Sequence, residues 1–300
     1  MAFARCAPPA PEMPPAILLR LCAGLALSAG IGWLAWRRQS LSRGGVLGAI
    51  LIGTAMFGFG GLASGLSLIV FFVTSSLLSR LNEGRKRDLQ EKYAKGSRRD
   101  FGQALANGGA AAGLAVAAAL AHAAGDGQLT GVLLCAMLGA LATSNGDTWA
   151  TEIGALSRTR PRLITRPWRQ VAPGTSGGVT GLGTAAALAG AMLIGLTFVG
   201  LRGLNLDPEG WQSAGSALTV IAAAEVGGLA GALFDSVLGA TAQGIYRDPA
   251  RDMLTEKACA TDGQPYPLAR GWRWMSNDWV NFLASLAGAG VAALIRLAAV

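Results

Sequence analysis

The sequence carries little charge and almost no histidine. Only 14% of its 300 residues are charged, whereas 52% are hydrophobic, which is not the composition of a soluble globular protein. Its four cysteines, Cys6, Cys22, Cys135 and Cys259, make no metal-binding spacing, so neither a disulfide framework nor a zinc site is predicted. His122 lies far from the acidic residues in the expected topology, and no G-x-S-x-G motif has a histidine partner, which argues against a hydrolase triad.

Long apolar runs dominate instead, and eight of them are long enough to cross a hydrocarbon core of ~30 Å. They lie near residues 15–36, 44–61, 62–80, 101–124, 129–156, 177–201, 215–245 and 276–298. We therefore expect an all-α, polytopic integral membrane protein with about eight transmembrane helices. It would consist of a short tail, 1–14, and a single membrane domain, 15–300, whose first helix is retained rather than cleaved.

Basic residues gather in alternate connections between these runs. Four loops, 37–43, 80–100, 157–174 and 246–274, hold all but four of the 25 Lys and Arg residues. The positive-inside rule places these loops in the cytoplasm, and both termini then lie on the non-cytoplasmic side. This distribution accounts for the net charge of +8 without nucleic acid. We expect the plasma (inner) membrane of a bacterium, with the active site on its cytoplasmic face.

Five acidic residues lie in or at the rim of the expected helices: Asp147, Glu152, Glu225, Asp235 and Asp278. An ionisable group at membrane depth costs ~2.5–3.5 kcal/mol on insertion scales, so each one is a functional candidate. Four of them lie toward the cytoplasmic ends of their helices, and Glu225 is deeper.

The stretch "ATSNGDTWATE" carries the first two acids. The pair Asn145-Gly is a turn signal, and Ser144 followed by Asp147 has the form of a capping box, so we expect the helix to break and restart there. Capping alone would explain Asp147, but it does not require Glu152. Thr148 and Glu152 share a helical face, and such oxygen ligands suit Mg²⁺ together with substrate phosphates. We therefore assign Asp147, Glu152 and Asp235 as catalytic residues and Mg²⁺ ligands.

The segment "RPRLITRPWRQVAPGTSGGVTGLG" follows with arginines and a glycine-rich turn that is expected to open helix 177–201. Backbone N–H groups at such a helix start bind anions, although a close-packed, capped helix start would have the same pattern. The expected phosphate- or nucleotide-binding residues are Arg99, Arg158, Arg166, Arg169, Thr175, Ser176, Gly177 and Gly178.

Further polar residues interrupt the apolar runs. Gln243 follows Asp235, Asn281 lies one turn inside the last helix, and Asn107 lies in the run that begins after the second basic loop. Capping would also account for Asn277 and Asp278, and hydrogen bonding between helices would account for Asn107. The additional polar site residues are Asn107, Asn145, Thr148, Gln243, Asn277, Asp278 and Asn281.

Five blocks in order, "KYAKGSRRDFGQALANGG", "ATSNGDTWATEIG", "PGTSGGVTGLG", "FDSVLGATAQ" and "NDWVNFLAS", resemble the signature segments of the transmembrane protein 19 family, also called domain of unknown function 92. The resemblance spans roughly residues 40 to 298. Plant plastid members of that family are phytyl-phosphate kinases, so it implies phosphoryl transfer from a nucleoside triphosphate to an isoprenyl monophosphate lipid.

A looser similarity links the region from Asp147 to Gly178 to membrane enzymes that use CTP, which makes CTP a candidate donor. The alternatives are a cytidylyltransferase that forms a CDP-lipid and a transporter or flippase of an anionic lipid or solute. Intramembrane acids and a broken helix would also fit ion-coupled transport. The sequence does not determine the oligomeric state.

Overall fold

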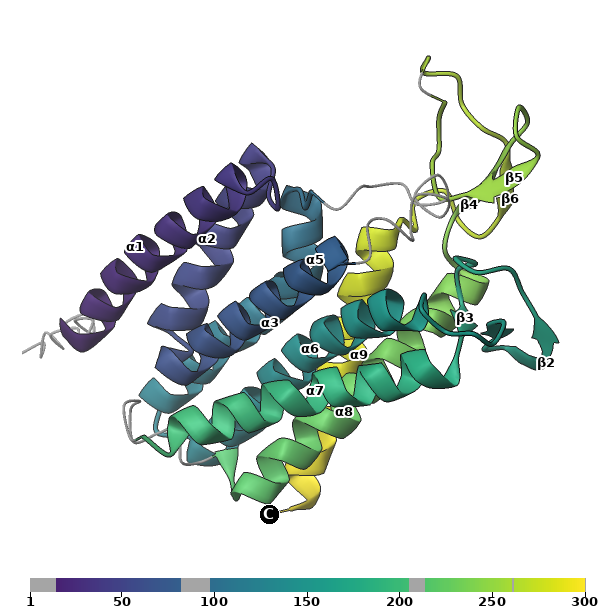
Figure 1. Ribbon diagram of the computed structural model, residues 1–300. Coiled ribbons are helices and arrows are strands. Elements are labelled where there is room, and N and C mark those ends of the chain that lie inside the picture. Colours follow the sequence, from purple (N-terminus) through teal and green to yellow (C-terminus); the bar gives the residue numbers. More distant parts are fainter. Residues whose placement is uncertain (1–14, 82–97, 205–213, 261, 300) are drawn as a thin grey trace, which may run out of the picture.

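Antiparallel and parallel α-helices make up most of the chain (Figure 1). The computed structural model describes residues 15–81, 98–204, 214–260 and 262–299. Its helices are α1 (Pro15–Arg37), α2 (Arg43–Gly58), α3 (Gly61–Leu81), α5 (Phe101–Ala123), α6 (Gly127–Gly154), α7 (Gly181–Arg202), α8 (Ala217–Thr241) and α9 (Asn277–Ala298). Seven of them are long and apolar enough to cross a membrane, and α2 is shorter at 16 residues. The expected polytopic helical fold is confirmed, while the tail 1–14 and residues 82–97 of the second basic loop lie outside the described residues.

Two small antiparallel sheets, which the all-α expectation did not include, lie at the same end of the bundle (Figure 1). The first has the order β2-β1-β3, with β1 (Arg162–Leu163), β2 (Arg166–Gln170) and β3 (Gly178–Val179). The second has the order β5-β4-β6, with β4 (Ile245–Asp248), β5 (Met253–Thr255) and β6 (Leu268–Arg270). Each sheet lies in one of the long polar connections, after α6 and after α8, so these connections are ordered structures rather than simple loops.

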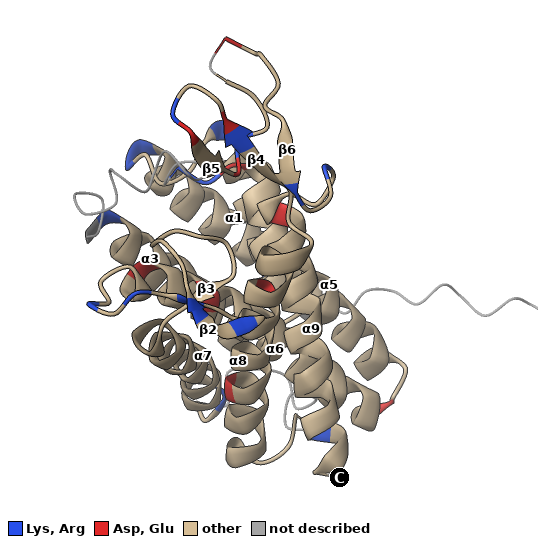
Figure 2. Cartoon of the chain, turned by 90° about the vertical axis from the view of Figure 1, so that its right-hand side faces the viewer, with Lys and Arg blue, Asp and Glu red and all other residues tan. Residues whose placement is uncertain are grey.

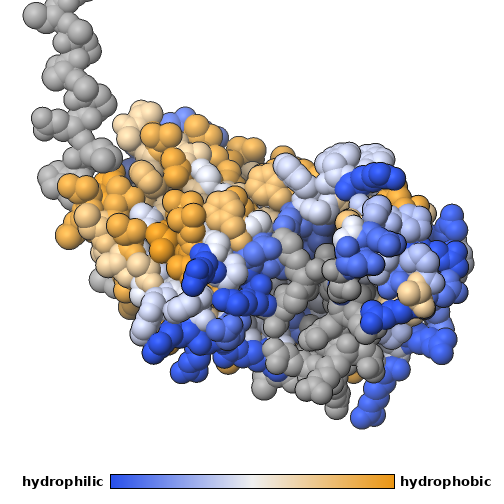
Figure 3. Space-filling model, turned by 90° about the horizontal axis from the view of Figure 1, so that it is seen from above, coloured by the Kyte–Doolittle hydropathy of each residue, from blue (hydrophilic) through white to orange (hydrophobic). Residues whose placement is uncertain are grey.

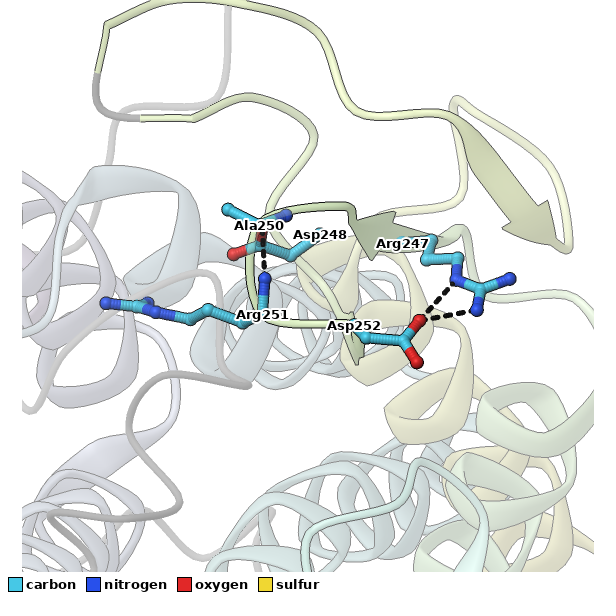
Figure 4. Close-up of polar contacts among 5 residues, drawn as sticks. All are labelled: Arg247, Asp248, Ala250, Arg251 and Asp252. Atoms are coloured by element: carbon cyan, nitrogen blue, oxygen red, sulfur yellow. Dashed lines mark hydrogen bonds and ion pairs between the residues drawn. The ribbon is translucent and has the colours of Figure 1, made fainter.

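Side chains close the turn between β4 and β5 (Figure 4). The Asp248 carboxylate accepts hydrogen bonds from the N–H groups of Ala250 and Arg251, at 2.9 and 3.3 Å, and Arg247 forms an ion pair with Asp252. An Asp that binds the backbone two and three residues ahead is a turn-forming arrangement. This turn sets the position of the chain that follows β5.

Helix α6 is the central element, and it contacts α3, α5, α7, α8 and α9. Small residues permit its neighbours to approach closely. A Cβ atom added at Gly139 would lie 2.6 Å from the Gly288 carbonyl oxygen of α9, and one added at Gly146 would lie 2.8 Å from the Ala187 carbonyl oxygen of α7. The buried α6 can therefore present polar side chains to the interior without exposing them to lipid.

The expected break at Asn145 is wrong, because α6 runs without interruption from Gly127 to Gly154. The Asn145 side chain is fully buried; its amide donates to the Gly190 carbonyl at 2.7 Å, and its oxygen accepts from Thr74 and Ser75 at 3.3 and 3.4 Å. Asn145 thus joins α3, α6 and α7, and these tertiary hydrogen bonds override its local turn tendency.

The expected capping box is wrong for a related reason. Ser144 Oγ donates to the Asn107 carbonyl oxygen of α5, at 2.7 Å. Since the helix continues through Asp147, no free N–H groups require a cap there. The Asp147 carboxylate is left available to face the interior.

Lys and Arg residues gather at the end of the bundle that holds the two sheets (Figure 2). Arg37 and Arg80 belong to the last turns of α1 and α3 at this end, whereas Arg202 and Arg296 end α7 and α9 at the opposite end. Seen from above, apolar surface covers the side of α1 and α2, and hydrophilic surface covers the side of the sheets (Figure 3). The described basic segments therefore share one side, as the alternating path requires.

Two glycines of α9 provide a matched test of this packing. A Cβ atom added at Gly288 would lie 2.0 Å from Thr143 Oγ1 and 2.7 Å from the Gly227 carbonyl oxygen, whereas Gly290 has no heavy atom within 4 Å. Overpacking a core costs about 1–3 kcal/mol, so Gly288→Ala should lower the midpoint of thermal unfolding in detergent by several degrees. Gly290→Ala should leave it unchanged, and equal midpoints for the two variants would contradict the packing.

Candidate active site

A cavity of about 410 Å³ opens at the end of the bundle that carries the sheets. We call it the polar cavity. Its walls come from the C-terminal parts of α3, α6 and α8, the N-terminal parts of α5, α7 and α9, and the turn at 173–180. The sequence-predicted residues that line it are Arg99, Asn107, Asp147, Thr148, Glu152, Thr175, Ser176, Gly177, Gly178, Asp235, Gln243, Asn277, Asp278 and Asn281.

The remaining predicted residues lie elsewhere. Asn145 is buried in the bundle below the cavity, where it holds helices together. Arg166 and Arg169 belong to β2, whose side chains are all exposed, and Arg158 is also exposed. These three arginines do not line the polar cavity.

Asp147 and Asp235 face each other because of how α6 and α8 pack. Both helices run toward the cavity, and Gly231 of α8 meets Thr143 of α6 so closely that an added Cβ atom would lie 2.2 Å from Thr143 Oγ1. One helical turn is 3.6 residues, so Asp147 and Asp235, each four residues further along, both lie about one turn beyond this contact and line the cavity. Like charge on Asp147 acts on Asp235 directly, and Glu256 adds a second negative charge.

Oxygen Oδ2 of Asp235 is buried, and no described residue donates a hydrogen bond to it. A buried carboxylate oxygen without a donor, beside a second carboxylate, is costly unless a proton or a cation neutralises it. Among the described residues, no three His, Cys, Asp or Glu side chains form one metal-binding group. Glu152 therefore does not join the two aspartates in a three-ligand set, and the donor set fits Mg²⁺ held by one or two carboxylates together with phosphate oxygens.

Glu152 is oriented by other partners. Its side chain is only 6% exposed, and it accepts a hydrogen bond from Ser79 of α3 at 2.9 Å. It also attracts the guanidinium of Arg99. Burial lowers the pKa of Arg99 to about 10, against the opposing influence of Glu152, so the arginine remains a cation at neutral pH. Glu152 thus positions a buried positive charge in the cavity wall.

The glycine-rich turn does not open a helix as expected. Helix α7 begins at Gly181, with Thr180 as its N-cap, and Gly178 belongs to β3. Gly177 has φ +81°, and an added Cβ atom would lie 2.5 Å from that of Ala240 in α8. The turn is consequently packed against α8, and the start of α7 lines the cavity through Thr180, Gly183 and Thr184.

Two residues that sequence reasoning did not single out fix this turn. Glu256, directly after β5, accepts hydrogen bonds from Ser176 at 3.2 Å and from Gln243 at 3.0 Å. Arg270 of β6 donates to the carbonyl oxygens of Ser176 and Ala240, and burial lowers its pKa. Both lie in a polar segment without helical periodicity, so the sequence offers no signal that they reach the cavity.

The alternating path brings three helix N-termini to the cavity, those of α5, α7 and α9. The α5 end is closed by a capping box between Asp100 and Gln103, whereas Ser276 caps α9 without a side-chain hydrogen bond. Helix N-termini carry partial positive charge and bind anions. The polar cavity therefore combines carboxylates that suit a divalent cation with backbone ends and Arg99 that suit phosphates.

Other lining side chains are already engaged. Thr148 and Thr175 donate to the carbonyl oxygens of Ser144 and Ala172, at 2.8 and 2.7 Å. Asn107 donates within its own helix to the Gln103 carbonyl at 2.9 Å. The hydroxyl oxygens keep a free capacity to accept hydrogen bonds.

Comparison with known proteins identifies relatives over most of the chain. The family described as Integral membrane protein DUF92 matches residues 26–289. Protein PGR of Arabidopsis thaliana is 34% identical over 277 residues, which cover 89% of this chain and 93% of that protein. An uncharacterized membrane protein of Methanocaldococcus jannaschii is 28% identical over 223 residues, 74% of this chain and 83% of its own. No solved structure matches.

The role of Glu256 is testable in the protein alone. Glu256→Ala removes the acceptor of Ser176 and Gln243, and a hydrogen bond to a charged group contributes ~1.5–3 kcal/mol. Amide hydrogens in peptides from 172–180 should then exchange with deuterium about tenfold faster or more. The control Asp262→Ala removes an exposed carboxylate of the same segment, and its exchange at 172–180 should match wild type. Unchanged exchange in Glu256→Ala would show that the turn is held by other contacts.

Proposed function

Because the chain belongs to the DUF92 family of integral membrane proteins, we propose that it is a membrane kinase for lipid phosphates. It would transfer a phosphoryl group from a nucleoside triphosphate, with CTP as one candidate, to an isoprenyl monophosphate and form the diphosphate. The resemblance of the signature segments to phytyl-phosphate kinases supports this substrate class. The reaction would take place on the side of the membrane that holds the basic segments, which the positive-inside rule predicts to be the cytoplasmic side.

One observation carries the proposal: Asp147 and Asp235 face each other in a cavity to which three helix N-termini and Arg99 point. Carboxylates repel phosphates, so such a cavity suits phosphates only together with a cation. Mg²⁺, held by the two aspartates, would neutralise charge on the triphosphate when bound.

The chain's own residues would do the rest by positioning. Arg99, held by Glu152, binds the acceptor phosphate, and the starts of α7 and α9 with the turn at 173–180 bind the triphosphate. The acceptor is already an anion, so no general base is needed, which fits the absence of histidine from the described lining. Phosphoryl transfer depends mainly on such positioning and on charge neutralisation.

The alternative of ion-coupled transport loses one of its two supports, because α6 is continuous. Its other support, Glu225 of α8, does not line the polar cavity. A cytidylyltransferase would use the same cavity and differ in its products.

The direct test uses purified protein with Mg²⁺, each of the four nucleoside triphosphates and phytyl or geranylgeranyl monophosphate. A kinase yields the lipid diphosphate and a nucleoside diphosphate, whereas release of pyrophosphate with a CDP-lipid would show a cytidylyltransferase instead. No lipid product with any nucleotide would overturn the proposed function. Removal of Mg²⁺ with a chelator should abolish turnover.

Substitutions of acidic residues inside and outside the polar cavity test which of them the reaction requires. Asp147→Asn and Asp235→Asn keep the shape of the side chain but remove its charge, and each should lower kcat by roughly 100-fold or more, as is typical for loss of one electrostatic contact in a site. Glu225→Gln makes the same change outside the cavity and should keep wild-type turnover. Full activity of both aspartate variants would refute the site.

The side of the membrane that the polar cavity faces is testable with the exposed Cys259, which lies between β5 and β6. A membrane-impermeant maleimide should label it in inverted membrane vesicles and not in intact cells. The Cys259→Ser variant should lose that label. Labelling of Cys259 from outside intact cells would place the polar cavity on the other face.

A further inference from the structure

A second, smaller cavity of about 80 Å³ adjoins the polar cavity among α1, α2, α3 and α5. We call it the apolar cavity. Most of its wall is hydrocarbon, including Ile52, Phe57, Leu68, Phe71 and Phe72. The polar and apolar cavities share three lining residues, Arg99, Gln103 and Asn107. The two spaces therefore meet at the start of α5.

Arg99 is the only charged residue among the described lining of the apolar cavity. Its guanidinium lies 5.4 Å from the ring centre of Phe71 and 6.0 Å from that of Phe72. The backbone around it is fixed, because its N–H donates to the Ser40 carbonyl and its carbonyl accepts from the Ser42 N–H, at 3.0 and 2.9 Å. The cation is thus held at the boundary between polar and hydrocarbon walls.

The other two shared side chains are already hydrogen-bonded. The Gln103 side-chain oxygen accepts from the Asp100 N–H at 3.0 Å, and the Asn107 amide donates to the Gln103 carbonyl at 2.9 Å. Both amide side chains are neutral, so Arg99, the cation among the described residues of this junction, is the group best suited to an anion. An anion bound there would have hydrocarbon wall directly beside it.

We propose that the apolar cavity binds the isoprene unit next to the phosphate of the acceptor lipid, with that phosphate at Arg99; this inference rests on the proposed function. The volume is about half that of an engineered cavity of ~150 Å³ that holds benzene, so it suits a few carbon atoms rather than a whole chain. The rest of the tail would extend beyond the apolar cavity.

The position of Arg99 also argues against a diacyl phosphatidate as the acceptor lipid. In a prenyl phosphate, hydrocarbon begins at the carbon attached to the phosphate oxygen. In a diacyl phosphatidate, a glycerol with two ester groups stands between the phosphate and its chains. Those esters would enter the apolar cavity without hydrogen-bond partners, which is costly, so the junction selects a lipid without a glycerol.

Photolabelling tests the assignment without requiring turnover. The probe is farnesyl monophosphate with a diazirine in the isoprene unit next to the phosphate, used on the full-length protein in detergent or vesicles. Label should map to peptides of α2, α3 or α5 that line the apolar cavity, and unlabelled farnesyl monophosphate should displace it while dioleoyl phosphatidate should not. Label on outward residues such as Leu47 and Leu51, or equal displacement by phosphatidate, would overturn the inference.

Substitutions that fill the apolar cavity provide a second test of the inference. Ala49 lines it, and Ala49→Phe should raise KM for the prenyl monophosphate about tenfold while KM for the nucleotide stays the same. Ala26→Phe makes the same change on an exposed position of α1 and should behave as wild type. Leu68→Trp serves the same purpose if Ala49→Phe does not fold, and unchanged lipid KM in a folded filling variant would overturn the inference.

These outcomes separate the inference from the proposed function. Turnover of prenyl phosphate with label outside the apolar cavity refutes the inference and leaves the kinase assignment intact. Competed label inside it without turnover refutes the kinase assignment and supports the lipid-binding site.

Discussion

The contact between Gly231 of α8 and Thr143 of α6 is the constraint on which the rest of the site depends. No larger residue fits at position 231, where an added Cβ atom would lie 2.2 Å from Thr143 Oγ1. The contact fixes the relative register of two helices that run in the same direction. Asp147 and Asp235 are each four residues further on, so the contact also fixes how the two carboxylates are placed relative to each other in the polar cavity.

The path of the chain determines which helix ends lie around Asp147 and Asp235. Helices that alternate in direction place the N-termini of α5, α7 and α9 among the C-termini of α3, α6 and α8 at one end of the bundle. The partial positive charges of the N-termini then lie around the carboxylates. The two long connections, each folded into a small sheet, cover this end and hold the glycine-rich turn through Glu256 and Arg270.

Hydropathy and charge were sufficient to predict the helices, because a lipid-spanning segment must be long, apolar and closed in its own hydrogen bonds. The same rule marked Asp147 and Asp235 as candidate site residues, since a carboxylate in such a segment is energetically costly and is usually retained for function. Local rules failed where tertiary contacts decide. Asn145 was expected to break α6, but partners on α3 and α7, distant in sequence, keep it helical.

Tertiary structure also decides where the other site residues lie. Glu152 was expected to bind metal, and only the fold shows that Ser79, on another helix, donates a hydrogen bond to its carboxylate and that Arg99 lies nearby. Glu256 lies in a polar segment whose sequence has no periodicity, so nothing local indicates that it reaches the polar cavity. Arg166 and Arg169 were expected to bind phosphate, but β2 leaves them exposed and away from the lining.

The central claim is that Asp147 and Asp235 hold one ion for one nucleotide, and a binding cycle tests it most directly. Nucleotide affinity would be titrated with and without Mg²⁺ for wild type, Asp147→Asn, Asp235→Asn and the double variant. If the two carboxylates share one ion, affinity should require Mg²⁺, fall about tenfold or more in each single variant, and fall little further in the double variant, because contacting groups are not additive. Affinity that does not depend on Mg²⁺, or losses that simply add, would contradict a shared site.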